Sequence, residues 1–417
     1  MVLKHIADFL NGEYPYPLIS MEEAWRRIAA VVRPLKPVRQ PLTSVLGCVL
    51  AEDVIATTNI PSFPASAMDG YAVIAADTEP RRLVIGDRHA GPETPLHIRP
   101  GTAARIMTGA PLPDGADAVI PVEGTSESGG IVQLHVSVAP GDYVRPIGQD
   151  LAAGDVVLEK GSTLGPAEIG LLAAIGHTQV LVYPKVRVAV MATGDELVPP
   201  ESTPGPGQIR DSNSSAILAA VESVRAIPMH RGLIPDDKET LRTTILDGVA
   251  RADMLITCGG VSMGAHDYVK PLLAELGTIH FGRVAVKPGK PLTFAEVQGV
   301  PVFGLPGFPV SSLVSFELFV RPALRLMAGQ RRLWRPEMRV RLSHDIQHEP
   351  DRVEFQRAKV TQRDGTYWAV TTGSQVSGRL QSLVGANALL RLPAGETLFH
   401  TGDEVTAIMI EQPEVWP

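Results

Sequence analysis

The chain has 417 residues, of which 44% are hydrophobic, and this length and composition predict about three folded domains with sizeable cores. Its 38 basic and 45 acidic residues give a net charge of −7, which disfavours a general binder of nucleic acid or of an anionic membrane surface. We find no signal peptide and no run of 18 apolar residues, so we expect a cytoplasmic protein. Cys48 and Cys258 lie far apart in the sequence, and we expect both to be small core residues.

The first 58 residues mix helical and extended patterns. Ser20 precedes Glu23 by three residues, a capping-box pattern that predicts a helix to about Val32. Residues 45–56 are typical of a helical turn followed by an extended piece. Mixed structure returns at residues 151–183, where Pro166 marks a helix start. We expect the two segments to form one small α/β body.

Residues 59–150 contain short apolar strands separated by many prolines and glycines, a pattern that predicts an all-β insertion. Two of its loops are unusual. One ends in Asp69-Gly70, and the other pairs Thr108-Gly109 with Asp114-Gly115. An isolated Asp-Gly pair is more often a plain turn than a functional site.

Residues 184–329 alternate strands and helices. Residues 185–197, 252–264 and 300–312 each begin with an apolar stretch typical of a strand. Helical patterns follow at residues 212–223 and 311–327. This alternation predicts βαβ units and a mostly parallel sheet. Since ligands bind outside the carboxyl ends of such strands, the three glycine-rich loops should converge on one crevice. Short alternating stretches in residues 337–412 predict a small antiparallel barrel or sandwich.

The loops of this crevice suit a polyanion. Glycines in TCGGVSMG let backbone N–H groups approach a phosphate closely, and VKPGKP adds Lys287 and Lys290. There is no GxGxxG fingerprint and no Walker lysine, so neither a standard dinucleotide site nor a P-loop is indicated. Each glycine-rich loop alone is weak evidence, because tight turns use glycine in any case.

Three carboxylates, Glu196, Asp236 and Asp267, follow the predicted strand ends. Mg²⁺ prefers a few carboxylates together with phosphate oxygens and water, so this trio fits a Mg²⁺-assisted reaction at a phosphoanhydride. The alternative for Asp236 or its neighbour Asp237 is to cap the helix that runs to Val249.

Motifs spread over nearly the whole chain resemble those of one protein family. They are, in chain order, SAMDGYAV (66–73), RIMTGAPLPDGADAV (105–119), ATGDEL (192–197), QIRDSN (208–213), CGGVSMGAHDY (258–268), AVKPGKP (285–291), GLPGFPVS (304–311), EFQRA (354–358) and QVSGRLQSLVGANAL (375–389). The chain is identified from them as a member of the MoeA family, the molybdopterin molybdenumtransferases, which are also related to the C-terminal part of gephyrin.

The resemblance implies a multidomain α/β plus β fold. The implied domains are a mixed α/β dimerisation body (residues 1–58 and 151–183), an inserted β domain (59–150), a MogA-like α/β molybdopterin-binding domain (184–329) and a C-terminal β-barrel (330–417). It also implies a homodimer whose sites are shared between subunits. Candidate partners are a MogA-type adenylyltransferase and molybdoenzyme maturation proteins, with neither nucleic acid nor membrane.

The implied reaction is Mg²⁺-dependent: molybdate and adenylylated molybdopterin react, the phosphoanhydride is cleaved, and AMP is released. The implied catalytic positions are Asp69, Thr108, Glu196, Asp236 and Asp267, of which the last three are also the metal positions. The implied molybdopterin-binding positions are Thr193, Gly194, Asp211, Ser212, Asn213, Gly259, Gly260, Ser262, Gly264, Pro306 and Gly307. The implied oxyanion-binding positions are Lys287, Lys290, Pro291, Ser311, Arg357 and Ser377.

Three positions depart from the family pattern. Phe308 stands where the family usually has Asn, Ala265 where it has an acidic residue, and Gln149 where Glu is frequent. These changes leave open a different metal preference, such as tungstate, or a weakened paralogue. Two other readings compete with an insertase: a gephyrin-like non-catalytic scaffold, and an adenylyltransferase of the MogA type. Retention of the catalytic set favours the insertase over the scaffold, and AMP release rather than pyrophosphate release distinguishes it from the adenylyltransferase.

Overall fold

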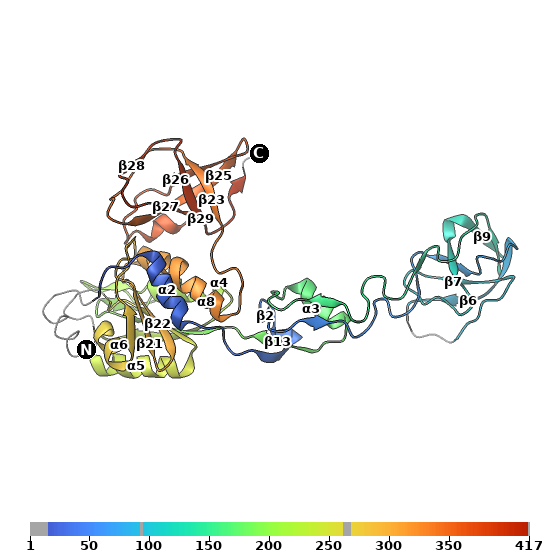
Figure 1. The fold of residues 1–417 in the computed structure, drawn as a ribbon, viewed down its shortest axis with the longest axis horizontal. Coiled ribbons are helices and arrows are strands. Elements are labelled where there is room, and N and C mark those ends of the chain that lie inside the picture. The colour runs from blue at the N-terminus through green and yellow to red at the C-terminus, as the bar shows by residue number, and fades with distance from the viewer. Residues whose placement is uncertain (1–15, 92–94, 262–267, 416–417) are drawn as a thin grey trace. The chain divides into compact units, whose positions relative to one another are not determined.

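A computed structural model describes residues 16–91, 95–261 and 268–415 of the chain (Figure 1). The chain divides into two compact units. The first contains residues up to 38, residues 47–49 and residues from 182 onward, and the second contains residues 39–46 and 50–181. No helix in the described parts is long and apolar enough to cross a membrane.

The first unit contains a six-stranded sheet in the order β17-β14-β18-β22-β21-β19. Its strands are β14 (Arg187–Thr193), β17 (Ile227–Ile234), β18 (Met254–Cys258), β19 (Thr278–Phe281), β21 (Thr293–Val297) and β22 (Val300–Leu305). The first four strands in this order run parallel, while β21 and β19 are antiparallel additions at one edge. The predicted α/β domain with a mostly parallel sheet is therefore confirmed.

Helices cover both faces of this sheet (Figure 1). They are α2 (Met21–Val31), α4 (Asn213–Ser223), α5 (Lys238–Arg251), α6 (Val269–Leu276), α7 (Pro309–Ser315) and α8 (Arg321–Met327), with a π-helical segment, η3 (Phe316–Val320), between the last two. The predicted helix over 311–327 thus begins two residues earlier and is interrupted by η3. The helix predicted from Ser20 is confirmed, since the Ser20 hydroxyl accepts from the Glu23 backbone N–H at 3.1 Å.

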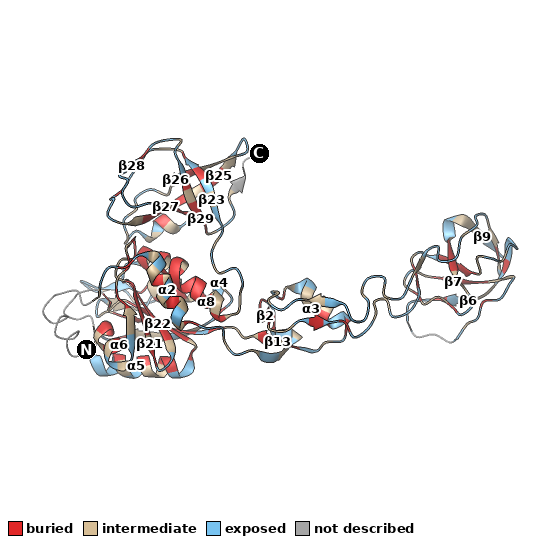
Figure 2. Cartoon of the chain, viewed as in Figure 1, coloured by how far each residue is buried: buried red, intermediate tan, exposed pale blue. Residues whose placement is uncertain are grey.

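Residues of β14 alternate between two hydrophobic cores. Val188, Val190 and Ala192 pack in the core formed with α2, α4, α7 and α8, whereas Ala189 and Met191 pack in the core formed with α5 and α6. Figure 2 shows these helices and strands with their buried positions in red. A strand buried on both faces needs apolar residues throughout, which explains the uninterrupted run in the sequence. Both cysteines are buried and free, as expected.

The C-terminal part of the first unit is a barrel that closes in the order β25-β26-β23-β29-β27 and back to β25. Its strands are β23 (Glu337–Leu342), β25 (Val353–Arg363), β26 (Thr366–Thr371), β27 (Ala388–Leu392) and β29 (Glu404–Met409). The prediction of a barrel is confirmed, but β23 and β26 pair in parallel, so the expectation of a purely antiparallel one is wrong.

Short elements complete the first unit. They are β15 (Leu197–Val198), β16 (Ile209–Arg210), β20 (Val286–Lys287), β24 (Ile346–Gln347), β28 (Leu398–Phe399), β30 (Glu414–Val415) and the 3-10 helix η4 (Leu380–Leu383). Among them β20 matters most for the site, because it pairs with β25 and so joins the α/β domain to the barrel.

The second unit contains a six-stranded sheet in the order β8-β5-β7-β6-β10-β9, as predicted for an all-β segment. Its strands are β5 (Gly70–Val73), β6 (Arg81–Arg88), β7 (Thr102–Ile106), β8 (Ala118–Pro121), β9 (Thr125–Ser128) and β10 (Ile131–Leu134), with the 3-10 helix η2 (Val122–Gly124) after β8. The pairs β4 (Ala65–Ser66) with β11 (Val144–Arg145) and β3 (Val54–Ile55) with β12 (Val156–Leu158) flank it in sequence.

A small three-stranded sheet has the order β1-β13-β2. Its strands are β1 (Val38–Pro41), β2 (Val49–Leu50) and β13 (Gln179–Tyr183), and the nearby helices are η1 (Leu42–Ser44) and α3 (Pro166–Ala174). Pro166 is the first residue of α3, as predicted, because a proline at that position loses no helical hydrogen bond. This pairing brings residues near 40 and 50 together with residues near 180. Helix α2, which the sequence assigned to the same small body, packs instead in the core of the six-stranded α/β sheet.

Candidate functional site

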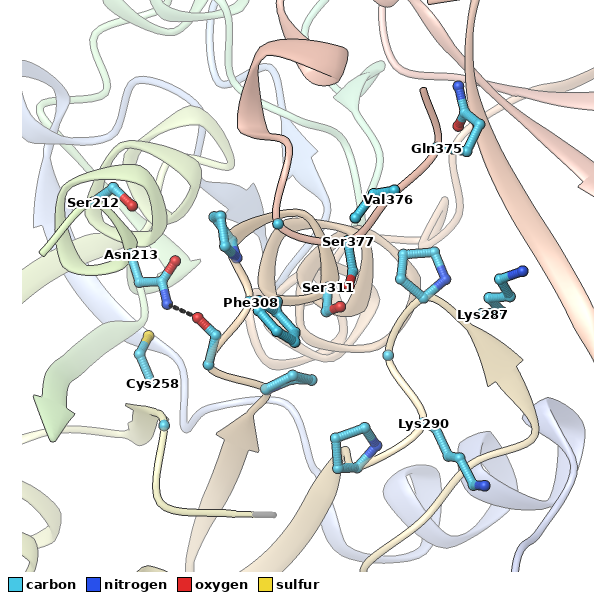
Figure 3. Close-up of a pocket in the computed structure, with 18 of the residues that line it drawn as sticks. Ser212, Asn213, Cys258, Lys287, Lys290, Phe308, Ser311, Gln375, Val376 and Ser377 are labelled. Carbon is cyan, nitrogen blue, oxygen red and sulfur yellow. Dashed lines mark hydrogen bonds between the residues drawn. The ribbon is translucent and has the colours of Figure 1, made fainter. Parts of the chain in front are cut away.

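A cavity of about 1350 Å³ lies at the carboxyl ends of β14, β18 and β22 (Figure 3). Residues that follow each of these strands line it, including Gly194, Gly259 and Gly307. The barrel supplies a further wall through the segments around residues 344–356 and 371–378. The cavity therefore lies where a parallel sheet places its ligands, and loops far apart in the sequence meet there.

Most of the residues proposed from the sequence line this single cavity. They are Thr193, Gly194, Glu196, Asp211, Ser212, Asn213, Asp236, Gly259, Gly260, Lys287, Lys290, Pro291, Pro306, Gly307, Ser311 and Ser377. Ser262, Gly264 and Asp267 lie outside the described residues, as do His266 and Ala265. Asp69 and Thr108 belong to the second unit.

Two glycines of the cavity have backbone conformations that disfavour any other residue, and a backbone atom also blocks a side chain at Gly259. At Gly194, φ is +150°, and a Cβ atom would lie 2.6 Å from a carboxylate oxygen of Glu196. At Gly259, φ is +91°, and a Cβ atom would lie 2.6 Å from the carbonyl oxygen of Thr193. These glycines let the ends of β14 and β18 approach closely and place the Glu196 carboxylate against the backbone.

Asp236 and Asp237 have different roles. The Thr193 hydroxyl donates to the Asp236 carboxylate, and Asp236 lines the cavity. Asp237 caps α5, because its carboxylate accepts from the Thr240 backbone N–H at 2.8 Å and from its hydroxyl at 2.6 Å. These bonds lower the pKa of Asp237. Of the two residues that the sequence offered as the cap, Asp237 is therefore the one that performs this role, and Asp236 does not.

The two lysines of the cavity differ in their surroundings. The Lys287 ammonium lies 3.5 Å from the Glu354 carboxylate, which is 3% exposed, and 3.6 Å from that of Glu349. Lys287 and Glu354 are cross-strand neighbours in the β20–β25 pair. Among the described residues, the Lys290 side chain has neither a hydrogen bond nor an ion pair. Lys290 is thus the more available cation for a ligand.

Arg357 does not line the cavity, so the structure does not support its assignment as a direct oxyanion ligand. It lies on β25 with its side chain fully buried, and its Nε atom donates to the Ser382 hydroxyl at 3.1 Å. Burial lowers its pKa to about 10. One of its terminal nitrogens lies 3.5 Å from the Val376 carbonyl oxygen, so the guanidinium holds the loop that carries Ser377. Because side chains alternate along a strand, Arg357 lies on the face of β25 opposite to Ala358 and Val360, which pack in the barrel core.

Sequence reasoning overlooked cavity residues that the barrel contributes. Glu354, Gln356 and Gln375 line the cavity, together with His344. Glu354 and Gln356 stand in the EFQRA motif, so that signal was present, but the β20–β25 pairing that brings them to the lysine loop is not visible in a sequence. Gln375 also accepts from the Arg357 backbone N–H at 2.8 Å, which orders its loop.

Asp69 and Thr108 form a pair in the second unit although 39 residues separate them. One carboxylate oxygen of Asp69 accepts from the Thr108 backbone N–H at 2.6 Å and from its hydroxyl at 2.7 Å. These two bonds lower the pKa of Asp69, because they favour the charged form. The pair is exposed, and it leaves the second carboxylate oxygen of Asp69 for another partner.

No cluster of three or more metal-binding side chains occurs within the described ranges. Glu196 and Asp236 line the cavity, and Asp267, the third predicted ligand, falls outside those ranges. Two carboxylates in a cavity that also holds lysines fit a Mg²⁺ ion that completes its shell with phosphate oxygens and water. The residues present are therefore compatible with Mg²⁺ bound together with a phosphorylated ligand.

Three consecutive parts of the chain match families of known proteins. Residues 19–176 match the MoeA N-terminal region (domain I and II), residues 189–326 a probable molybdopterin binding domain, and residues 339–410 the MoeA C-terminal region (domain IV). Molybdopterin molybdenumtransferase 2 of Mycobacterium tuberculosis is 38% identical over 387 residues, covering 90% of this chain and 95% of that protein. Gephyrin of Dictyostelium discoideum is also 38% identical, over 88% of this chain and 59% of gephyrin.

Solved structures show the same similarity. Two structures of the molybdopterin biosynthesis MoeA protein of Pyrococcus horikoshii give TM-scores of 0.80 and 0.76, at 32% and 30% identity. They cover 95% and 94% of this chain and 100% of each solved chain. The similarity therefore extends over all the domains described above.

Proposed function

Because the chain belongs to the MoeA family of molybdopterin molybdenumtransferases, we propose that it is a molybdenum insertase of molybdenum cofactor biosynthesis. The substrates are molybdate and adenylylated molybdopterin. Hydrolysis of the phosphoanhydride consumes one water molecule and releases AMP. The two dithiolene sulfurs replace two oxygens of molybdate, which leave as water with protons from the thiols and the solvent, and molybdenum remains on the dithiolene. The observation that carries this proposal is the single cavity that holds glycine loops, two lysines and two carboxylates.

The chain's own residues bind and orient the substrates. The glycine-containing loops after β14 and β18 line the cavity, and turns of this kind suit a phosphate. Lys290 provides a cation for molybdate, and the Ser311 and Ser377 hydroxyls lie on the same side of the cavity (Figure 3). Charge-assisted hydrogen bonds of this kind contribute about 1.5–3 kcal/mol each, enough to fix a small dianion.

Glu196 and Asp236 would hold the Mg²⁺ ion, with Asp267 as a third candidate. When bound, Mg²⁺ neutralises charge that develops on the phosphates as the anhydride breaks. The hydrogen bond from Thr193 fixes the orientation of the Asp236 carboxylate, so the group is in place before the substrate arrives.

We also propose that the enzyme acts as a homodimer whose sites combine the cavity of one subunit with Asp69 and Thr108 of the other. The support is the division of the catalytic set between two compact units and the free carboxylate oxygen of Asp69. Upstream, the chemistry requires an adenylyltransferase that supplies the AMP-activated molybdopterin. Downstream, the product must pass to apo-molybdoenzymes.

Single-turnover AMP release from adenylylated molybdopterin tests the function. We expect release that depends on molybdate and on Mg²⁺, and repeating the series with tungstate measures the preference for either oxyanion. Release of pyrophosphate instead would indicate an adenylyltransferase. If the protein binds the substrate but releases no AMP under any of these conditions, the result would indicate the gephyrin-like non-catalytic scaffold.

A further inference from the structure

Phe308 places an exposed aromatic ring in the cavity. It follows β22, directly precedes α7, and is 63% exposed although it lines the cavity wall. Other lining residues include the polar side chains of Asn213 and Ser311 (Figure 3). Packing normally buries an apolar ring of this size, so its exposure in a cavity leaves a flat apolar face available to a ligand.

The backbone beneath the ring is held in place by several hydrogen bonds. The Asn213 side chain donates to the Gly307 carbonyl oxygen at 2.6 Å, and the Ser312 backbone N–H donates to that of Phe308 at 3.0 Å. The Ser312 hydroxyl also donates to the carbonyl oxygen of Pro306. These bonds order the backbone that carries the ring, which lowers the entropy cost of binding against it.

One side of the ring is supported by the barrel. A Cβ atom placed on Gly378 would lie 3.6 and 3.8 Å from two ring carbons, so the ring lies against a residue that has no side chain. The Val310 backbone N–H donates to the Ser377 carbonyl oxygen at 3.2 Å, which ties the two loops together. Val376, 64% exposed, adds a second apolar surface to the same wall.

We propose that Phe308 is a stacking subsite for the planar fused heterocycle of a phosphate-bearing ligand. The inference rests on the proposed function, whose substrate carries two such heterocycles, adenine and pterin. A flat aromatic ring recognises both through its face, while the lysines and glycine loops of the cavity suit the phosphates. Phe308 would then set how the substrate is oriented relative to Lys290.

Binding of small probes to the full-length protein tests this subsite. The probes are AMP, unsubstituted pterin and ribose 5-phosphate, which keeps the phosphate but lacks a base. We expect Phe308→Ala to weaken AMP or pterin by roughly 5- to 150-fold, the range that removal of an aromatic stacking partner produces. Ribose 5-phosphate should bind equally to both proteins.

Two further variants serve as controls. Phe308→Trp retains a stacking surface, so it should restore affinity, and its indole fluorescence should be quenched by the bound heterocycle. Val384→Ala removes an apolar side chain that is 75% exposed and is not among the cavity-lining residues, so it should bind every probe like the wild type. Thermal melting of each variant verifies that it is folded.

The outcomes show whether adenine or pterin binds at Phe308, and they test the subsite separately from the proposed function. A loss confined to AMP assigns the subsite to adenine, and a loss confined to pterin assigns it to the pterin ring. Equal affinity of wild type and Phe308→Ala for both probes overturns the subsite and leaves the proposed function standing. A clear dependence on Phe308 in a protein that never releases AMP overturns the function alone, and a wild type that binds neither probe counts against both.

Discussion

Two threonine–aspartate pairs, one in each unit, show how differently this chain positions its predicted catalytic carboxylates. The Thr193–Asp236 pair joins the ends of two adjacent parallel strands, β14 and β17, and lines the large cavity. The Asp69–Thr108 pair lies exposed in the second unit. A parallel sheet collects distant residues at one edge because its topology requires it, whereas the second pair depends on individual loops.

The largest expected effect tests whether the two pairs serve one site. Asp69→Ala and Asp236→Ala should each abolish most AMP release when purified alone. Mixing them under conditions that allow subunit exchange should restore about a quarter of the wild-type sites, since half the dimers are mixed and each has one intact site. Steady-state AMP release after mixing measures this recovery.

Remixing one variant with itself provides the control and should restore nothing. Light scattering should show a dimer throughout. A monomer at micromolar concentration under active conditions, or mixed dimers without activity, would contradict shared sites and assign the two pairs to separate roles.

A second test contrasts Asp236 with its neighbour Asp237. Asp236→Asn keeps an oxygen that can accept from Thr193 but removes the charge, so AMP release should slow by about 100-fold or more while the melting temperature stays near wild type. Asp237→Ala removes the cap of α5, so it should lower the melting temperature and leave AMP release unchanged. Single-turnover release with varied Mg²⁺, together with thermal melting, measures both. The opposite pattern would return the capping role to Asp236.

The two threonine–aspartate pairs show which parts of the fold and of the site could be predicted from the sequence. The buried strand β14, the parallel sheet and the meeting of its glycine loops followed from periodicity and from a general rule about such sheets. The roles of Asp236 and Asp237 could not be separated, because adjacent residues have the same composition signal and only the backbone geometry decides which one caps. Asp69 and Thr108 were identified by family resemblance, since no local pattern links residues 39 positions apart.

The barrel marks a second limit of prediction. Its strands were recognisable from alternation, but the parallel pairing of β23 with β26 and the β20–β25 contact depend on tertiary closure. For that reason Glu354 was missed as the partner of Lys287, and Arg357 was assigned to the cavity although its buried side chain bonds to Ser382 of η4.

A third test contrasts the two lysines within the cavity. Lys290→Ala should weaken molybdate use by roughly 10- to 100-fold and leave the melting temperature unchanged, because no described residue pairs with its side chain. Lys287→Ala should lower the melting temperature, because it leaves the buried carboxylate of Glu354 without its lysine partner. The dependence of AMP release on molybdate concentration and thermal melting measure the two effects. Equal molybdate dependence of Lys290→Ala and wild type would contradict its assignment to the oxyanion.

The smallest expected effect concerns the Asp69–Thr108 pair and acid. The hydrogen bonds from Thr108 lower the pKa of Asp69 in the folded protein below its ordinary value of about 4. A lowered folded-state pKa means that the charged carboxylate stabilises the fold above pH 4, and that this contribution is lost as the pH falls through the folded-state value. Asp69→Asn cannot ionise, so it lacks this dependence.

Thermal melting of both proteins from pH 6 to pH 2.5 should therefore show wild type losing stability relative to Asp69→Asn only in the acid part of the range. The shift should be small, because the pair is exposed and water competes for its hydrogen bonds. Thr108→Val, which removes the hydroxyl but keeps the backbone N–H donor, should retain part of the difference. Parallel melting curves for wild type and Asp69→Asn over the whole range would mean that the pair does not favour the charged carboxylate. Asp69 would then meet a partner subunit without prior orientation by Thr108.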